Sequence, residues 1–181
     1  MFFESYFKEI NNQLFTVNFD SLFEAAELIL NSSYAKKKTI VVGNGGSAAM
    51  SSHISVDLTK AAKIRSTNFN EADLLTCLAN DYGYESWVSK ALEFYADKND
   101  TIILFSSSGT SNNILNGAKS AKKMGLKIIT FSGFDHDNPL RKLGDVNFWV
   151  DSRSYNIIEM THHVWGVSII DYIIENRKNL K

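Results

Sequence analysis

The chain has 181 residues, of which 44% are hydrophobic and 22% are charged, and its formal net charge is -1. This length and hydrophobic content predict a single domain over residues 1–181 with one core. A charge so close to neutrality leaves no broad electrostatic field, which argues against nucleic acid as a partner, and any bound anion must be held by local groups. No apolar run reaches the roughly 18 residues of a membrane-spanning helix, so we expect no membrane partner.

Two further features of the sequence indicate where the protein works. The amino terminus carries Glu4 and Glu9 among its apolar residues, unlike the basic start of a secretory signal. The single cysteine, Cys77, cannot form an internal disulfide, and its apolar surroundings predict a small buried side chain. We therefore expect a cytoplasmic protein.

Hydrophobic periodicity predicts an α/β fold. After two amino-terminal helices within residues 1–34, short apolar runs alternate with helical stretches. This alternation is typical of a doubly wound parallel sheet, here of about five strands flanked by helices. The strands that the pattern places are residues 39–42, 101–105, 127–131 and 146–150, and the later helices are residues 47–62, 111–124 and 155–176. The last helix is apolar around much of its circumference, which indicates wide burial and a subunit contact.

A glycine-rich loop follows the first predicted strand. Gly43-Asn44-Gly45-Gly46-Ser47 allows close backbone approach and leads into a helix, whose free N–H groups favour an anion. The loop lacks the Gly-Lys-Ser/Thr of a P-loop and the spacing of a dinucleotide site, so we expect no nucleotide cofactor. The alternative is a turn that serves only the packing of the strand against the helix.

A serine-rich loop, Ser106 to Ser111, follows the second predicted strand and places five hydroxyl groups at the start of a helix. Hydroxyl and amide groups can satisfy a phosphate without a net charge. In a doubly wound sheet both loops lie at the carboxyl ends of the strands, where ligands bind. The alternative is a helix-capping loop without a ligand, but two such loops together predict a site for a sugar phosphate.

Three ordered motifs resemble the sugar isomerase (SIS) family and, within it, the phosphoheptose isomerases. They are Gly-Asn-Gly-Gly-Ser-Ala-Ala at 43–49, Ala-Asn-Asp-Tyr-Gly-Tyr-Glu at 79–85 and Ser-Ser-Ser-Gly-Thr-Ser at 106–111. The resemblance implies an aldose–ketose isomerase that converts sedoheptulose 7-phosphate to glycero-manno-heptose 7-phosphate, for the heptose of lipopolysaccharide or another surface glycan such as a capsule. It also implies a homotetramer with sites at the subunit interfaces.

The same resemblance assigns roles to residues within the motifs. The substrate contacts that it implies are Asn44, Gly45, Ser47 and Asp81, and the phosphate contacts are Ser106, Ser107, Ser108 and Ser111. For Asp81 the alternative is a turn former beside Asn80 and Gly83.

An aldose–ketose exchange also needs a base that moves a proton between neighbouring carbons, and an acid or metal at the enediolate oxygen. His53 and Asp57 lie four residues apart on the helix after the glycine loop and share one face. Such a pair can also hold zinc, which some members of the family bind there, so zinc is an expected but optional cofactor. Asp57 stands where the family has glutamate and is shorter by one methylene. A plain surface pair is the alternative.

The last predicted helix departs from the family pattern. The family pattern in this helix is Gln-Glu-x-His, followed five residues later by a second histidine. It aligns with residues 158–161 and Gly166 of this chain, so the catalytic histidine of the family is missing from its place. At about 100° per residue, His162 lies angularly between positions 158 and 166. We therefore hypothesise that His162 replaces it as general acid or base.

The same hypothesis gives His162 a second possible role as a metal ligand beside His53 and Asp57, with His163 as the second choice for the catalytic group. A histidine pair packed near Trp165 at a subunit contact is the alternative.

Other functions stay open at this point. They are an isomerase of a different sugar phosphate, a sensor that binds without turnover, and a non-catalytic adaptor like the family members that bind the replication initiator. The complete glycine and serine loops argue against the adaptor, whereas the glycine at position 166 is the best argument for the sensor.

Overall fold

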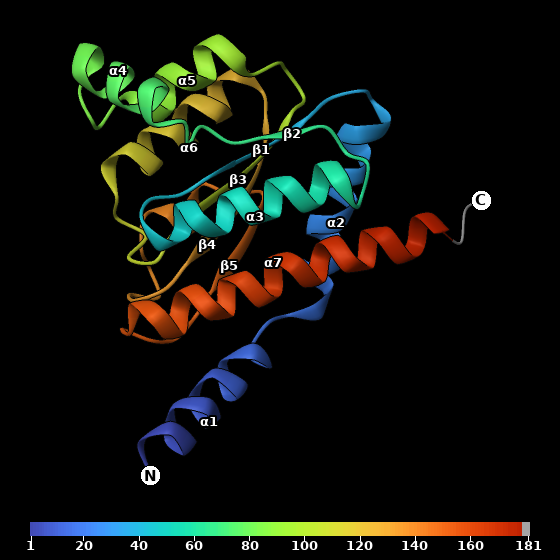
Figure 1. The fold of residues 1–181 in the computed structure, drawn as a ribbon, viewed down its shortest axis with the longest axis vertical. Helices are drawn as coiled ribbons and strands as arrows, with labels where there is room; N and C mark the ends of the chain where they lie inside the picture. The colour runs from blue at the N-terminus through green and yellow to red at the C-terminus, as the bar shows by residue number, and fades with distance from the viewer. Residues whose placement is uncertain (179–181) are drawn as a thin grey trace.

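The structure, a computed structural model, describes residues 1–178. At its centre lies a five-stranded parallel sheet in the order β2-β1-β3-β4-β5 (Figure 1). The strands are β1 (Thr39–Val42), β2 (Ser66–Thr67), β3 (Thr101–Ser106), β4 (Lys127–Ser132) and β5 (Val146–Trp149). The prediction of a doubly wound parallel sheet is confirmed.

Helices cover both faces of this sheet. One face carries α2 (Phe19–Tyr34), α3 (Gly46–Lys60) and α7 (Tyr155–Lys178), and the other carries α4 (Ala72–Tyr82), α5 (Trp87–Tyr95) and α6 (Asn112–Met124). A short 3-10 helix, η1 (Leu140–Lys142), precedes β5. On the first face α3 and α7 pack against each other along their lengths (Figure 1), and this seam positions the site described below.

The apolar strands divide the core into two clusters. Alternate residues of a strand point to opposite faces of a sheet. In β3, Ile103 and Phe105 therefore pack under α2, α3 and α7, whereas Ile102 and Leu104 pack under α4, α5 and α6. Every residue of β1 and β3 is buried, which explains why their sequences read as continuous apolar runs.

The first helix, α1 (Phe2–Leu14), has no buried residue and extends away from the rest of the molecule (Figure 1). Its second half is fastened to the rest of the molecule. Trp165 Nε1 donates a hydrogen bond of 3.0 Å to the Leu14 carbonyl, Gln13 Nε2 donates one of 2.8 Å to the Asp151 carbonyl, and Ser152 Oγ donates one of 3.5 Å to Glu9 Oε1. Among the described residues, no helix combines the length and apolarity that a membrane crossing requires.

One expectation about a side chain was wrong. Cys77 is exposed on α4 rather than buried, and its thiol donates to Asp81 Oδ2 at 3.7 Å. The negative charge of Asp81 raises the pKa of this thiol, so the thiolate is disfavoured.

Candidate active site

A cavity of about 90 Å³ lies where the glycine loop, the serine loop and the start of α7 meet. Its lining is mainly polar and consists of Asn44, Ser47, Phe105, Ser106, Ser107, Ser108, Ser111, Tyr155 and Glu159. Because β1 and β3 are parallel neighbours, with Val42 opposite Leu104, the loops that follow them emerge side by side. The structure thus brings together most of the residues that the sequence motifs singled out.

The glycine loop takes its shape from its surroundings. Gly45 caps α3 with a φ of +56°, which is strained for residues with a side chain, and open space lies beside it. Gly46 begins the helix, and a Cβ there would overlap the carboxylate of Glu159. Glycine at position 46 therefore lets α7 bring a carboxyl group to the amino end of α3.

The serine loop leaves hydroxyl groups free for a ligand. Ser106 Oγ donates to Ser111 Oγ at 3.2 Å, and Ser108 Oγ accepts from the Thr110 amide at 3.3 Å. Ser107 Oγ is buried and has no hydrogen-bond partner among the described residues. A buried hydroxyl without a partner is costly, so Ser107 indicates a place that a polar ligand fills.

Asn44 is held by a pair of reciprocal hydrogen bonds across the two loops. Its Nδ2 donates to Asn113 Oδ1 at 3.1 Å, and Asn113 Nδ2 donates to Asn44 Oδ1 at 2.9 Å. The Tyr84 hydroxyl adds a third bond of 3.2 Å to Asn44 Oδ1. A side-chain amide has two N–H groups, so this arrangement fixes the Asn44 amide and leaves one N–H for the cavity.

The motif at 79–85 contributes through residues other than the aspartate. Asp81 is exposed on α4, where its carboxylate accepts from Cys77 and from Asn80 Nδ2, and it does not line the cavity. Tyr84 and Glu85 instead connect the segment after α4 to the site, through Asn44 and through a 2.9 Å bond from Asn112 Nδ2 to Glu85 Oε1. The structure therefore does not bring Asp81 together with the two loops, and its role as a substrate contact stays a prediction.

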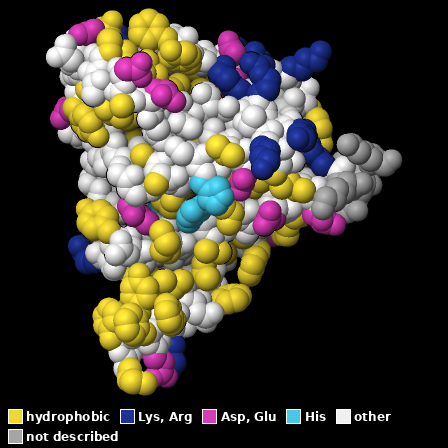
Figure 2. All heavy atoms as spheres, in the orientation of Figure 1, with side chains coloured by type: hydrophobic (Ala, Val, Ile, Leu, Met, Phe, Trp, Pro, Cys, Tyr) yellow, Lys and Arg dark blue, Asp and Glu magenta, His cyan; other side chains and the backbone are white. Residues whose placement is uncertain are grey.

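A chain of three titratable side chains lies farther along the α3 and α7 seam. Asp57 Oδ2 lies 3.1 Å from His53 Nε2, and His53 Nδ1 lies 2.8 Å from His163 Nε2. Figure 2 shows histidine side chains at the surface of this face of the molecule. Burial and the neighbouring His53 lower the pKa of His163, although Asp57 opposes this shift. His163 is therefore neutral at pH 7.5 and able to accept a proton.

The side chains of Asp57, His53 and His163 do not have the geometry of a metal centre. Both ring nitrogens of His53 are engaged by side chains on opposite sides, so the donor atoms do not converge on one point. Among residues 1–178 no group of three histidine, cysteine or carboxylate side chains is placed to hold an ion.

His162 lies in the core, not beside His53 and Asp57. Its side chain is fully buried among aromatic rings, and Nε2 lies 2.9 Å from the Ser132 carbonyl oxygen. Burial lowers its pKa to about 4. The hypothesis that His162 moves protons or binds a metal does not fit this placement, because no ligand in the cavity can reach the ring.

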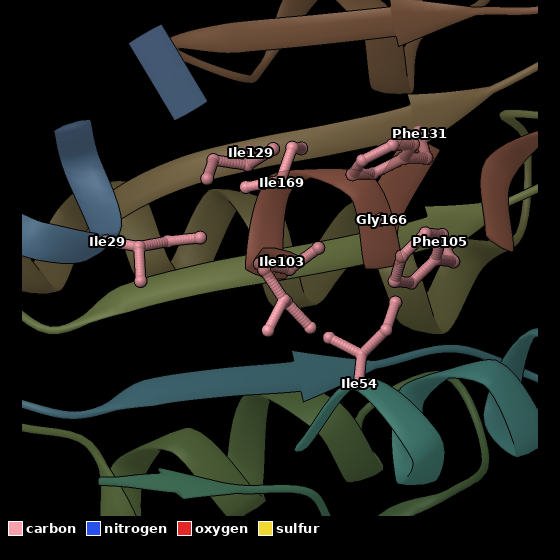
Figure 3. A pocket seen from close by; sticks show the side chains of 9 residues that line it. Ile29, Ile54, Ile103, Phe105, Ile129, Phe131, Gly166 and Ile169 are labelled. Carbon is pink, nitrogen blue, oxygen red and sulfur yellow. The ribbon is translucent and has the colours of Figure 1, made fainter. Parts of the chain in front are cut away.

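The reason is the orientation of α7. Ile158 packs in the core against Gly133, so His162, one turn later, faces the sheet as well. Gly166 lies at the seam (Figure 3), where an added Cβ would be 2.6 Å from Ile54 Cδ1. A histidine in the family position would have to displace Ile54, whereas His163 reaches His53 without this conflict.

The motifs alone did not identify four residues of the site. Glu159 and Tyr155 line the cavity, and Asn113 and Tyr84 hold Asn44. Tyr84 and Asn113 stand in or beside quoted motifs, but their role depends on contacts between segments. For Glu159 the available signal was its alignment with the glutamate of the family pattern.

Comparison with known proteins places this site in a family. Residues 3–133 match the SIS domain family. The phosphoheptose isomerase of Sulfurimonas denitrificans is 35% identical over 156 residues, which are 83% of this chain and 80% of that protein. A probable phosphoheptose isomerase of Thermoplasma acidophilum is 32% identical over 168 residues, which are 88% of this chain and 90% of that protein.

The fold agrees with a solved structure as well. Phosphoheptose isomerase GmhA from Neisseria gonorrhoeae matches with a TM-score of 0.87 and 24% identity, over 94% of this chain and 96% of that chain. The chain therefore belongs to the SIS domain family and, within it, to the phosphoheptose isomerases.

Proposed function

We propose that this protein is an aldose–ketose isomerase that interconverts sedoheptulose 7-phosphate and glycero-manno-heptose 7-phosphate. The observation that carries the proposal is that the serine cavity and the Asp57–His53–His163 chain share the seam between α3 and α7. The cavity offers hydroxyl and amide groups for a phosphate, and the hydrogen-bonded series Asp57–His53–His163 offers a base. These are the two tasks that the reaction requires.

The separation of the two parts suits a long sugar. Gly46 at the cavity and His53 in the chain are seven residues apart on α3, which corresponds to about 10 Å along the helix axis. The phosphate is on C7 and the reacting carbons are C1 and C2. An extended seven-carbon chain with bonds of about 1.5 Å spans a comparable length and brings its reacting end to the histidines.

His163 is the general base in this proposal. One arrangement satisfies both contacts of His53: the Nε2–H donates to Asp57, and Nδ1 accepts from the Nε2–H of His163. Nδ1 of His163 then has a free lone pair for the substrate. Asp57 acts through His53, because its charge stabilises the positive charge that His163 gains.

The proton transfer follows from this arrangement. His163 Nδ1 takes a proton from C1 of the ketose, the C–H electrons form the C1=C2 bond, and O2 gains a proton from solvent. His163 then returns the proton to C2, O1 releases its proton to solvent, and the aldehyde forms. The free N–H of Asn44 is suited to donate a hydrogen bond to a sugar oxygen nearer the phosphate.

The assembly belongs to the same proposal, in the form of a homotetramer with its sites at subunit interfaces. Its support is the exposed aromatic surface of α1, where Phe2, Phe3 and Phe7 are more than 60% exposed. Figure 2 shows hydrophobic side chains gathered on the segment that extends from the molecule. An apolar surface of this kind is typical of an interface between subunits. We place the reaction in the cytoplasm, in the supply of heptose to lipopolysaccharide or capsule.

The proposal is tested by NMR with sedoheptulose 7-phosphate and with five- and six-carbon ketose phosphates, with and without added zinc. We expect conversion of the seven-carbon sugar, and His163→Ala is expected to lower kcat by about 10² to 10⁴-fold. His136→Ala, an exposed histidine on the loop after β4, is the matched control and keeps full turnover. Binding without conversion would show a sensor, and absence of binding would show an adaptor.

A further inference from the structure

We propose that Glu159 is a phosphate-binding residue that is protonated when the ligand is bound, so that each phosphosugar entering the cavity brings about the uptake of one proton. This inference rests on the proposed function, because it concerns the same cavity. It adds a residue and a proton to the binding step.

The position of Glu159 is the first observation. Among the described residues that line the cavity, Glu159 is the one with a carboxyl group, and it lies there with the hydroxyl groups of the serine loop. Its carboxylate fills the space beside Gly46, the first residue of α3, where a Cβ would overlap Oε2. The free N–H groups of a helix start attract an anion. Glu159 and a bound phosphate therefore share one small space.

The second observation is that no cation separates them. The described lining residues carry hydroxyl, amide, phenol or aromatic groups, and none is lysine or arginine. A phosphate carries close to two negative charges at neutral pH. A like charge at short range raises the pKa of a carboxyl group, so the bound phosphate favours the protonated form of Glu159.

The third observation is that protonation of Glu159 breaks no hydrogen bond or ion pair within the described protein. No hydrogen bond or ion pair joins the Glu159 carboxylate to another described residue, and burial already raises its pKa in the ligand-free protein. A protonated carboxyl group has an O–H that can donate to a phosphate oxygen, and hydrogen bonds to ionised acceptors are short and strong. Protonation therefore turns a repulsive contact into a hydrogen bond.

Few other titratable groups face Glu159. On α7, Tyr155 lines the cavity one turn earlier, and His163 lies one turn later beside His53 and Asp57. The segments of α3 and the serine loop that line the cavity contribute Ser47 and the serines 106–108 and 111. Tyr84 reaches Asn44 from the segment after α4. His163 is neutral above pH 7.5, so it contributes no charge to the binding equilibrium there.

The test is isothermal titration calorimetry of the full chain with heptitol 7-phosphate, the reduced sugar that cannot isomerise. Titrations at pH 7.5, 8.0 and 8.5, each in two buffers of different ionisation enthalpy, give the number of protons taken up. The second pKa of a phosphate monoester is about 6, so the ligand is a dianion throughout. We expect uptake that approaches one proton and a Kd that rises up to tenfold per pH unit.

Three variants make this result specific. Glu159→Gln keeps the shape and an N–H donor, and we expect no proton uptake, a Kd independent of pH and tighter binding than wild type at pH 8.5. Tyr155→Phe is the control for the second ionisable group of the cavity and keeps the uptake of the wild type. Tyr84→Phe is the corresponding control for the tyrosine at Asn44 and also keeps it.

The outcomes separate this inference from the proposed function. Binding by the wild type without proton uptake overturns the role of Glu159 and leaves the isomerase intact. The same holds if Glu159→Gln weakens binding tenfold at every pH, because the carboxylate would then be an acceptor for a sugar hydroxyl. Absence of binding in both wild type and Glu159→Gln overturns the phosphate site and with it the proposed function.

Discussion

At the scale of single residues, Asn113 determines how Asn44 presents itself to the ligand. Asn113→Ala removes both bonds of the reciprocal pair and leaves the Asn44 amide with Tyr84 alone. Leaving a partly buried amide without its partner costs about 1–3 kcal/mol. We expect the Kd for heptitol 7-phosphate, measured by calorimetry, to rise about 5 to 100-fold. Asn112→Ala, which loses only the bond to Glu85, is the control, and an equal effect in both variants would contradict the pairing.

The residues that the sequence could not assign are those whose role depends on the face of a helix. His162 and His163 are neighbours on α7, about 100° apart. The helix is apolar around most of its circumference, so composition does not distinguish the two rings. Only the packing of α7 against α3 and the sheet distinguishes them, because it places His163 against His53 and buries His162 beside the Ser132 carbonyl.

At the scale of elements, α1 contacts α7 but leaves an aromatic surface exposed. Phe3→Ser with Phe7→Ser removes two exposed rings, and burying one phenylalanine stabilises by about 1.5–3 kcal/mol. If α1 packs against a second copy, the double variant dissociates to a smaller assembly, which light scattering measures, while circular dichroism stays unchanged. Lys8→Ser with Glu4→Ser, which break a 3.0 Å surface ion pair on the same helix, form the control. An unchanged mass would show that α1 lies outside the interface.

The sequence predicted the elements with strong apolar patterns. β1, β3 and β4 are rich in valine, isoleucine, leucine or phenylalanine, and α6 ends at Met124 before Gly125, which adopts φ +78° as a left-handed cap. α4 and α5 were not predicted. Residues 79–85, which include the end of α4, were interpreted as a motif with turn formers, and no helix was expected over residues 87–95. β2 has two residues, Ser66 and Thr67, which form no apolar run and pair only because β1 is beside them.

At the scale of the whole molecule, the burial of His162 makes the stability of the fold depend on pH. Its pKa is about 4 in the folded protein and about 6.5 when the chain is unfolded, because burial disfavours the charged ring. The unfolded chain therefore binds a proton below pH 6.5 that the folded chain accepts only near pH 4. The stability associated with neutral His162 is complete above pH 6.5 and is lost as the pH falls toward 4.

This difference of pKa corresponds to about 3 kcal/mol over the window from pH 6.5 to 4. His162→Gln keeps an N–H that can donate to the Ser132 carbonyl but cannot take up a proton. The free energy of unfolding of this variant, measured with urea, should therefore fall by about 3 kcal/mol less than that of the wild type between pH 7 and 4. His136→Gln changes an exposed histidine and should follow the wild type. Parallel losses in wild type and His162→Gln would show that other groups cause the acid instability. Since His162 lies beneath the seam that positions His163, acid unfolding at this point would remove the base from the site as well.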